Sequence, residues 1–165
     1  MSKKTLVVYY SWSCGNTEKI AEQLADACGA DIARIETVVP YPEDYQETVD
    51  QGQCEVNAGF MPEIENLEYS PADYDVVVIG TPTWWYTMAP AVKTFIAEND
   101  FSGKTVVALS TNGSWPGNVT ADIEDACAGA SFGPALEVQF DSTGGDRQET
   151  PQSQVDAWIE QIRSL

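Results

Sequence analysis

Short apolar runs alternate with segments of helical periodicity along the whole chain. The run at residues 75–80 (DVVVIG) is apolar at successive positions. Such a run is typical of a strand in a parallel sheet that is covered by helices on both faces. Comparable runs recur at intervals. The predicted strands are residues 4–10, 31–38, 75–80, 104–110 and 135–140.

The segments between these runs have helical spacing. Residues 16–29 place apolar side chains on one face, with Asn16 or Thr17 as the expected N-cap and Gly29 as the expected end. Further helices are predicted after Pro90, over residues 118–127 and after Thr150. Strands joined by crossover helices predict one doubly wound α/β domain over residues 1–165.

Residues 39–71 interrupt this alternation. The segment is rich in Glu, Pro and Tyr, and no Lys or Arg occurs between Arg34 and Lys93. It predicts a short helix near residues 43–55, followed by an exposed loop. The simplest interpretation of its acidic residues is a solvated face. The functional alternative is a surface that repels anions and attracts a basic partner protein.

The composition narrows the possible functions. The chain has 165 residues, with 26 Asp and Glu against 8 Lys and Arg, and a net charge of −18. Nucleic acids and anionic membranes attract clustered Lys and Arg, so we expect this chain to bind neither. The absence of histidine excludes Ser–His–Asp triads and histidine-ligated zinc, and no metal site is expected.

The four cysteines are widely spaced and form no C-x-x-C motif. Cys28 and Cys127 fall among apolar residues on predicted helices, so they are expected in the core. The first apolar run is too brief for a signal peptide, and no run reaches transmembrane length. We therefore expect a cytoplasmic protein with reduced thiols.

Ligands of doubly wound sheets bind outside the carboxyl ends of the strands, and three loops there have unusual sequences. The first is SWSCGNT, which opens directly into a helix. Its hydroxyls, its amide, its glycine and the helix N-terminus predict an anion cradle that needs no Lys or Arg. The alternative is an ordinary strand–helix turn. The candidate residues are Ser11, Trp12, Ser13, Cys14, Gly15, Asn16 and Thr17.

The second loop contains three consecutive aromatic residues, which cannot all face one core in a turn. A flat heteroaromatic ligand would explain their exposure, although core packing of Trp84 remains the alternative. The candidates are Pro82, Thr83, Trp84, Trp85 and Tyr86. The third loop is rich in glycine, which leaves N–H groups free to face a ligand edge. Its candidates are Thr111, Asn112, Gly113, Ser114 and Gly117.

These loops resemble those of the flavodoxin-like family, and the resemblance spans essentially the whole chain. SWSCGNT looks like the family's phosphate loop of the type [TS]-x-[TS]-x-G-[NQ]-[TS], and TPTWW looks like the loop whose aromatic residue covers the isoalloxazine ring. The stretches PYPEDY and TMAPAV are similar to a bacterial subgroup distinct from the small electron-carrier flavodoxins. The resemblance implies flavin mononucleotide (FMN) as cofactor and a five-stranded parallel sheet in the order 2-1-3-4-5.

The resemblance also implies a role for each loop. The first loop would hold the FMN phosphate, with Cys14 contributing backbone and Trp12 either flanking the phosphate or packing. The second and third loops would line the flavin ring, with Trp85 stacked on it and Trp84 as the alternative. The flavin carries the chemistry, so we expect no catalytic side chain; a bound phosphate disfavours Cys14 as a thiolate nucleophile. Asp141 and residues 144–145 either shape a substrate mouth or form a surface turn.

Three functions remain open at this point. The first is an electron carrier that passes electrons between redox partner proteins through bound FMN. The second is an FMN-dependent reductase that reacts with NAD(P)H or a quinone-like molecule. The third is a binding module that uses the same fold without redox chemistry. We expect a monomer or a homodimer.

Overall fold

The computed structural model describes residues 3–12, 14–143 and 145–165. The strands are β1 (Thr5–Tyr9), β2 (Asp31–Arg34), β3 (Val76–Trp84), β4 (Thr87–Met88), β5 (Thr105–Asn112), β6 (Ser131–Phe132) and β7 (Leu136–Gln139). The α-helices are α1 (Asn16–Cys28), α2 (Tyr45–Ala58), α3 (Pro90–Ala97), α4 (Val119–Ala126) and α5 (Gln152–Arg163), and a 3₁₀ turn, η1 (Pro71–Asp73), precedes β3.

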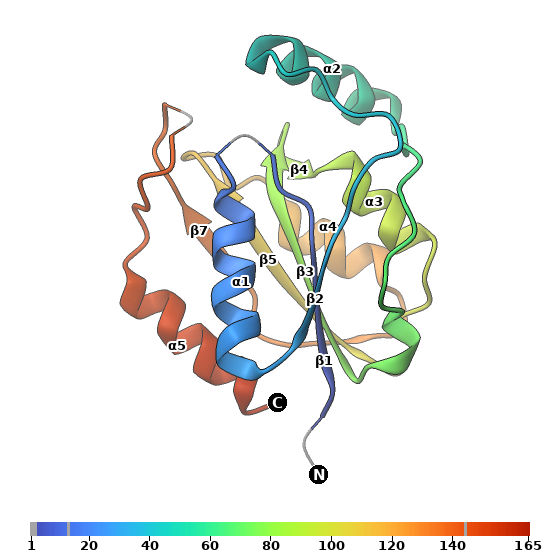
Figure 1. The fold of residues 1–165 in the computed structure, drawn as a ribbon, viewed down its shortest axis with the longest axis vertical. Coiled ribbons are helices and arrows are strands. Elements are labelled where there is room, and N and C mark those ends of the chain that lie inside the picture. Colours follow the sequence, from blue (N-terminus) through green and yellow to red (C-terminus); the bar gives the residue numbers. More distant parts are fainter. Residues whose placement is uncertain (1–2, 13, 144) are drawn as a thin grey trace.

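The sheet confirms the predicted topology. Its parallel strands run in the order β2–β1–β3–β5, and both β6 and β7 pair in parallel with β5 (Figure 1). The strand predicted at 135–140 corresponds to β7, whereas the two-residue β6 was not predicted. β4 turns back antiparallel on β3 as a short hairpin. The second predicted strand, residues 31–38, ends earlier, at Arg34.

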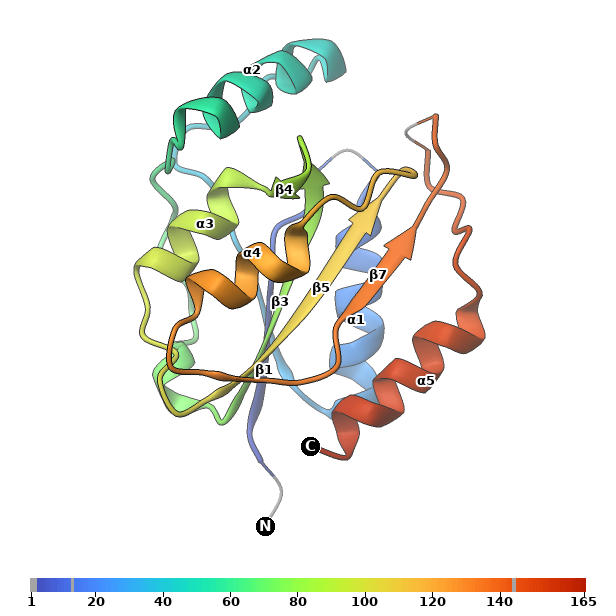
Figure 2. The same cartoon turned by 180° about the vertical axis from the view of Figure 1, so that it is seen from behind.

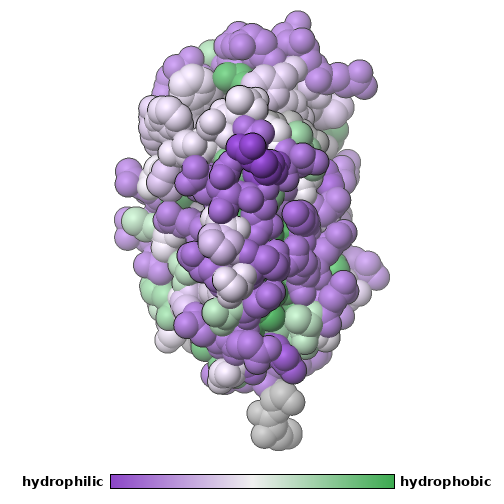
Figure 3. All heavy atoms as spheres, turned by 90° about the vertical axis from the view of Figure 1, so that its left-hand side faces the viewer, coloured by the Kyte–Doolittle hydropathy of each residue, from purple (hydrophilic) through white to green (hydrophobic). Residues whose placement is uncertain are grey.

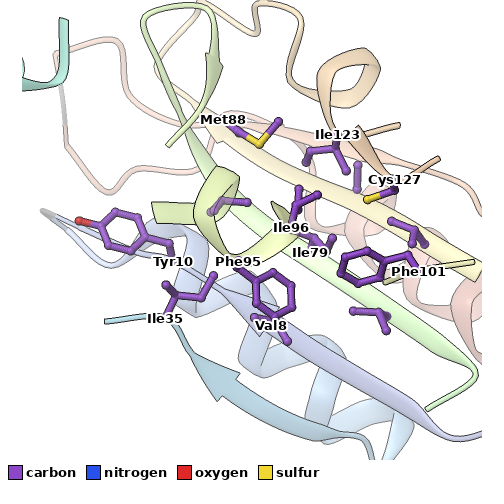
Figure 4. Packing of buried hydrophobic residues seen from close by; sticks show 14 of the residues in the cluster. Val8, Tyr10, Ile35, Ile79, Met88, Phe95, Ile96, Phe101, Ile123 and Cys127 are labelled. Carbon is purple, nitrogen blue, oxygen red and sulfur yellow. The ribbon is translucent and has the colours of Figure 1, made fainter. Parts of the chain in front are cut away.

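Helices cover both faces of the sheet, as predicted. α1 and α5 lie on one face, and α3 and α4 lie on the other (Figures 1 and 2). The apolar side chains of each face form their own core cluster. Figure 4 shows the cluster beneath α3 and α4, where the labelled side chains are Val8, Tyr10, Ile35, Ile79, Met88, Phe95, Ile96, Phe101, Ile123 and Cys127. Cys127 is buried as expected, while Cys28 is half-buried against the other cluster.

Helix α2 covers neither face. It comes from the segment that interrupts the sequence pattern, and it lies across the carboxyl end of the sheet (Figure 1). The carboxylate of Asp44 caps it by accepting a hydrogen bond from the Glu47 N–H (2.9 Å). The exposed acidic helix predicted at 43–55 therefore exists, but it is positioned over the edge where the three loops meet.

The start of α1 differs from the expectation. Gly15, not Asn16 or Thr17, is the N-cap residue, and it adopts the left-handed conformation with φ of 73°. This conformation favours glycine because it has no Cβ. Asn16 is already the first helical residue, and Gly29 ends the helix as predicted.

Polar residues predominate on the side of the molecule shown in Figure 3. Among the residues that the structure describes, no helix is both long enough and apolar enough to span a bilayer. Cys28, Cys54 and Cys127 are free thiols.

Candidate functional site

A partly open cavity of about 280 Å³ lies at the carboxyl end of the sheet. All three predicted loops contribute to it, because parallel strands end at the same edge. The loop residues that line it are Trp12, Cys14, Asn16, Pro82, Thr83, Trp84, Trp85, Thr111, Asn112 and Gly113. The remaining walls come from α2 and from the segment after β7, through Tyr45, Thr48, Val49, Gly52, Phe140, Asp141 and Gly145.

The first loop is held in place by the helix that follows it. The Ser11 hydroxyl is buried and accepts a hydrogen bond from the Glu18 N–H (3.3 Å), so it supports the first turn of α1 rather than lining the cavity. The Asn16 side chain donates to the Gly145 carbonyl (3.1 Å), which ties this loop to the segment after β7. Arg34 donates to the Ser11 carbonyl from β2 (3.0 Å). The positive end of the α1 dipole therefore faces a fixed loop, an arrangement that favours anions.

A buried pair of hydroxyls joins the first loop to the third. The Thr17 and Thr111 hydroxyl oxygens are 2.7 Å apart, and both side chains are buried. Neither Thr17 nor Gly15 is among the residues that line the cavity. This pair fixes the distance between the start of α1 and the end of β5. It therefore also fixes the distance between the first and third loops at the cavity.

The second loop is a two-residue hairpin between β3 and β4. Trp85 and Tyr86 occupy its turn with φ of 49° and 70°, a conformation that normally selects Asn or Gly. The Trp85 indole N–H donates to the Val49 carbonyl (3.0 Å). Trp85 lines the cavity, whereas Tyr86 is 56% exposed and faces a neighbouring hollow beside Trp115.

Trp84, unlike Tyr86, packs among other aromatic rings. Its indole lies in a cluster of aromatic rings, edge-on to Tyr10 (5.8 Å between ring centres), Tyr41 (5.0 Å) and Trp12 (6.2 Å). Trp12 also stacks on Tyr45 of α2 (5.6 Å). Trp84 and Trp12 therefore pack against other rings and also line the cavity. The sequence had left packing and ligand contact as alternatives for each of them, and the structure is compatible with both.

The third loop continues the polar side of the cavity. Asn112 Oδ1 accepts a hydrogen bond from the Ser114 N–H (2.9 Å), and the Ser114 hydroxyl accepts one from the side-chain amide of Gln139 (3.2 Å). Ser114 and Gly117 do not line the cavity. Gly117 instead packs against the backbone of Tyr86.

Ionisation states in and beside the cavity follow from the surroundings. Burial, and then the Glu55 carboxylate, raises the pKa of the Tyr41 phenol, whose O–H donates to Glu55 (2.7 Å). Burial likewise raises the pKa of Tyr10. Hydrogen bonds from the Thr143 backbone and hydroxyl hold the pKa of Asp141 below its usual value. The phenols therefore stay neutral at physiological pH, and Asp141 stays negatively charged at the cavity wall.

The α2 wall was missed by sequence reasoning. Tyr45, Thr48, Val49 and Gly52 are spaced three, four and seven residues apart, and thus share one face of the helix. That spacing was a usable signal, but the acidic residues around it suggested a solvated face or a surface for a basic partner protein. In the segment after β7, Asp141 and Gly145 line the cavity. This position agrees with the hypothesis that they shape the mouth of a substrate site. Ser13 and Gly144 lie outside the described residues.

The chain belongs to the flavodoxin family, because the family model described as Flavodoxin matches residues 4–161. A solved structure of a Bacteroides uniformis protein is similar, with 26% identity, a TM-score of 0.79, and coverage of 97% of this chain and 99% of that one. The structure of a Lactobacillus acidophilus flavoprotein in complex with FMN shares the fold, with 22% identity and a TM-score of 0.72 over 95% of this chain and 99% of that one.

A curated relative is named for an activity. It is NAD(P)H dehydrogenase (quinone) 3 of Rhizobium meliloti, which is 33% identical over 132 residues. The match covers 73% of this chain but only 58% of the relative's length.

Proposed function

We propose that this protein binds one FMN in the cavity at the carboxyl end of the sheet and transfers electrons through it. Membership of the flavodoxin family and the FMN complex of the Lactobacillus acidophilus flavoprotein support the cofactor assignment. The observation that carries the proposal is the cavity itself. It joins the N-terminus of α1 to an aromatic hairpin and to a polar loop at the end of β5.

The residues present fit FMN. A single helix N-terminus, with Gly15 in the left-handed conformation, suits one phosphate group. Trp85 offers an aromatic surface, and Asn112 and Gly113 offer polar edges. The cavity is partly open, and its volume of about 280 Å³ is near the lower limit for cofactor sites, so it would not enclose a whole flavin ring.

The chain's own residues have three tasks in this proposal. α1 and the first loop would hold the phosphate, and the Thr17–Thr111 pair holds the start of α1 against the end of β5. The hairpin and α2 would exclude water from one side of a ring bound there. Bound FMN supplies reversible one- and two-electron redox chemistry, so no side chain need act as an acid or a nucleophile.

The first candidate function is that of an electron carrier between redox partner proteins. The second is that of an FMN-dependent reductase that reacts with NAD(P)H or a quinone-like molecule. The relative named NAD(P)H dehydrogenase (quinone) 3 supports this second function. A binding module without redox chemistry is not favoured. We also propose a cytoplasmic location, which the free thiols of Cys28, Cys54 and Cys127 support.

The test is to purify the protein, record its absorbance spectrum and identify the extracted chromophore by mass. We expect the absorbance bands of bound flavin and one FMN per chain. An adenine-containing flavin in the extract, or no flavin uptake after addition of FMN, would contradict the proposal.

A further inference from the structure

Arg34 lies beside the first loop, which the sequence predicted to hold an anion without any Lys or Arg. Arg34 is the last residue of β2, and it pairs in register with Tyr9 at the end of β1. Because these parallel strands end at the same edge of the sheet, the Arg34 side chain reaches the loop that follows β1. There its guanidinium donates to the Ser11 carbonyl (3.0 Å). The fold therefore holds a cation next to the loop that we assign to the phosphate.

The Glu18 carboxylate reaches the same place from α1. Glu18 lies in the first turn of the helix, and its backbone N–H donates to the Ser11 hydroxyl (3.3 Å). Its Oε2 atom accepts hydrogen bonds from the Arg34 guanidinium and from the Tyr9 hydroxyl (2.7 Å). A negative charge in the first turn is stabilised by the helix dipole, but it repels any further anion at that helix end. Glu18 thus competes with a bound phosphate for the N-terminus of α1.

Two carboxylates share the Arg34 guanidinium. Its Nη1 atom pairs with Glu18, and its Nε atom pairs with Glu36 (3.1 Å). The group of Arg34, Glu18 and Glu36 therefore carries one net negative charge, and it would carry two without Arg34. All three side chains are partly or largely exposed, so salt screens their charges. The charge of Arg34 decides how strongly this group repels an anion at the start of α1.

No other cation neutralises Glu18 in the part of the chain that the structure describes. Arg34 is its only ion-pair partner there. Lys19 follows directly on α1, but its ammonium lies 5.8 Å from the centre of the Phe140 ring, next to the end of β7. Neither Arg34 nor Glu18 lines the cavity, so any effect of Arg34 on a ligand there is exerted from outside the cavity wall.

We propose that Arg34 is a positioning residue for the FMN phosphate. It acts through Glu18, by neutralising the carboxylate that would otherwise repel the phosphate from the N-terminus of α1. The inference rests on the proposed function, because the anion concerned is the phosphate of bound FMN. It differs from a purely structural role of the hydrogen bond to Ser11 in one consequence. The effect of losing Arg34 should be reversed when Glu18 also loses its charge.

The test is FMN titration at low salt, followed by quenching of flavin fluorescence. Arg34→Gln adds one net negative charge to the group and should weaken FMN binding at least fivefold. Arg34→Lys keeps the charge and should stay within twofold of the unmodified protein. The double variant Arg34→Gln/Glu18→Gln has the net charge of the unmodified protein and should also return to within twofold. Glu18→Gln alone should bind FMN at least twofold more tightly.

Salt separates repulsion from a change in the shape of the loop. At about 1 M sodium chloride, where the Debye length is about 3 Å, the loss of affinity in Arg34→Gln should fall below twofold. Arg163→Gln is the matched control, because Arg163 also pairs with a glutamate, Glu160 (2.8 Å). It lies at the end of α5, which points away from the three loops (Figure 1). This variant changes the net charge by the same amount and should leave the FMN affinity unchanged.

A double variant that binds FMN as weakly as Arg34→Gln would overturn the inference, and so would a loss of affinity that high salt does not reduce. Either result would mean that Arg34 only holds the backbone of Ser11. Urea denaturation shows whether Arg34→Gln is folded. If it is not, Glu18→Gln alone decides, and FMN binding no tighter than that of the unmodified protein overturns the inference.

FMN uptake by the unmodified protein, measured first, separates this inference from the proposed function. A protein that takes up no FMN contradicts the proposed function. Inorganic phosphate is then the probe, and the amide NMR signals of residues 15–18 report its binding. Phosphate affinity that is at least fivefold weaker in Arg34→Gln, and restored in the double variant, would support the charge role of Arg34. Equal affinities in these proteins, or no phosphate binding, would overturn it.

Discussion

The carbonyl oxygen of Tyr86 occupies the space that a side chain on Gly117 would need. A Cβ on Gly117, whose φ is +60°, would lie 2.3 Å from that oxygen. The same oxygen accepts a hydrogen bond from the Asn118 N–H (2.7 Å). The loop after β5 therefore clamps the β3–β4 hairpin and holds Trp85 and Tyr86 in backbone conformations that are costly for large side chains.

The clamp predicts a large effect of a small substitution. Gly117→Ala should lower the free energy of unfolding by about 2–4 kcal/mol, because it combines a left-handed backbone with a steric clash. Urea denaturation measures it. Gly103→Ala is the matched control, since Gly103 also has a positive φ (+78°) but a Cβ on it would meet nothing within 4 Å. It should cost only about 1 kcal/mol. Equal losses in the two variants would show that the contact with Tyr86 is unimportant.

Substitution of the two hairpin tryptophans should have different effects, one on FMN affinity and the other on the free energy of unfolding. Trp85→Ala should weaken FMN binding by about 1–3 kcal/mol, by analogy with aromatic stacking of bases. Trp84→Ala should instead lower the free energy of unfolding by about 2–3 kcal/mol, because its indole packs against Tyr10 and Tyr41. Quenching of FMN fluorescence gives the affinities. If neither variant changes the FMN affinity, neither indole contacts the bound FMN.

Alkaline pH should destabilise the fold through Tyr9. Burial, and then the hydrogen bond to Glu18, raises the pKa of Tyr9 to about 12 in the folded protein, despite an opposing effect of Arg34. The unfolded chain has a tyrosine pKa near 10, about its ordinary value. The neutral phenol thus contributes stability that is complete below pH 10 and is lost as the pH rises from 10 toward 12.

Urea denaturation at pH 9 and pH 11.5 measures this loss. Tyr9→Phe has no phenol to ionise, so it should lose less stability than the unmodified protein over this interval, by an amount on the order of 1–2 kcal/mol. Other buried tyrosines are present in both proteins, and their contribution cancels in the comparison. Parallel pH profiles for the two proteins would show that Tyr9 ionises as freely in the folded state as in the unfolded one.

Most of the fold could be predicted because its signals are local. The run DVVVIG and the apolar face of α1 indicated the covered parallel sheet, and Gly29 indicated a helix end that the structure confirms. The N-cap of α1 was predicted wrongly. Asn and Thr are common N-cap residues because their side chains accept a backbone hydrogen bond, but Gly15 takes this position here because it tolerates a positive φ. β6 has only two residues, which is too short for any periodicity.

The candidate site was predictable where it depends on strand ends and not where it depends on long-range packing. The loops after β1, β3 and β5 meet because parallel strands end at one edge of the sheet. The position of α2 depends instead on Gly52 meeting Trp84 and on the Trp85–Val49 hydrogen bond. Neither contact has a sequence signature. The outward direction of Tyr86 likewise follows from the contact of its backbone with Gly117.

FMN titration of two matched Cys14 variants tests the central claim most directly. Cys14 lines the cavity beside the N-terminus of α1, and it is exposed. Cys14→Ser keeps this position neutral, whereas Cys14→Asp adds a negative charge near the proposed phosphate. Repulsion between charges about 4 Å apart amounts to roughly 1–4 kcal/mol for effective dielectric constants of 80 down to 20. We predict that the unmodified protein binds one FMN per chain and that the Asp variant binds it at least fivefold more weakly than the Ser variant. Equal FMN affinities in the two variants, or the absence of FMN binding by the unmodified protein, would contradict the account.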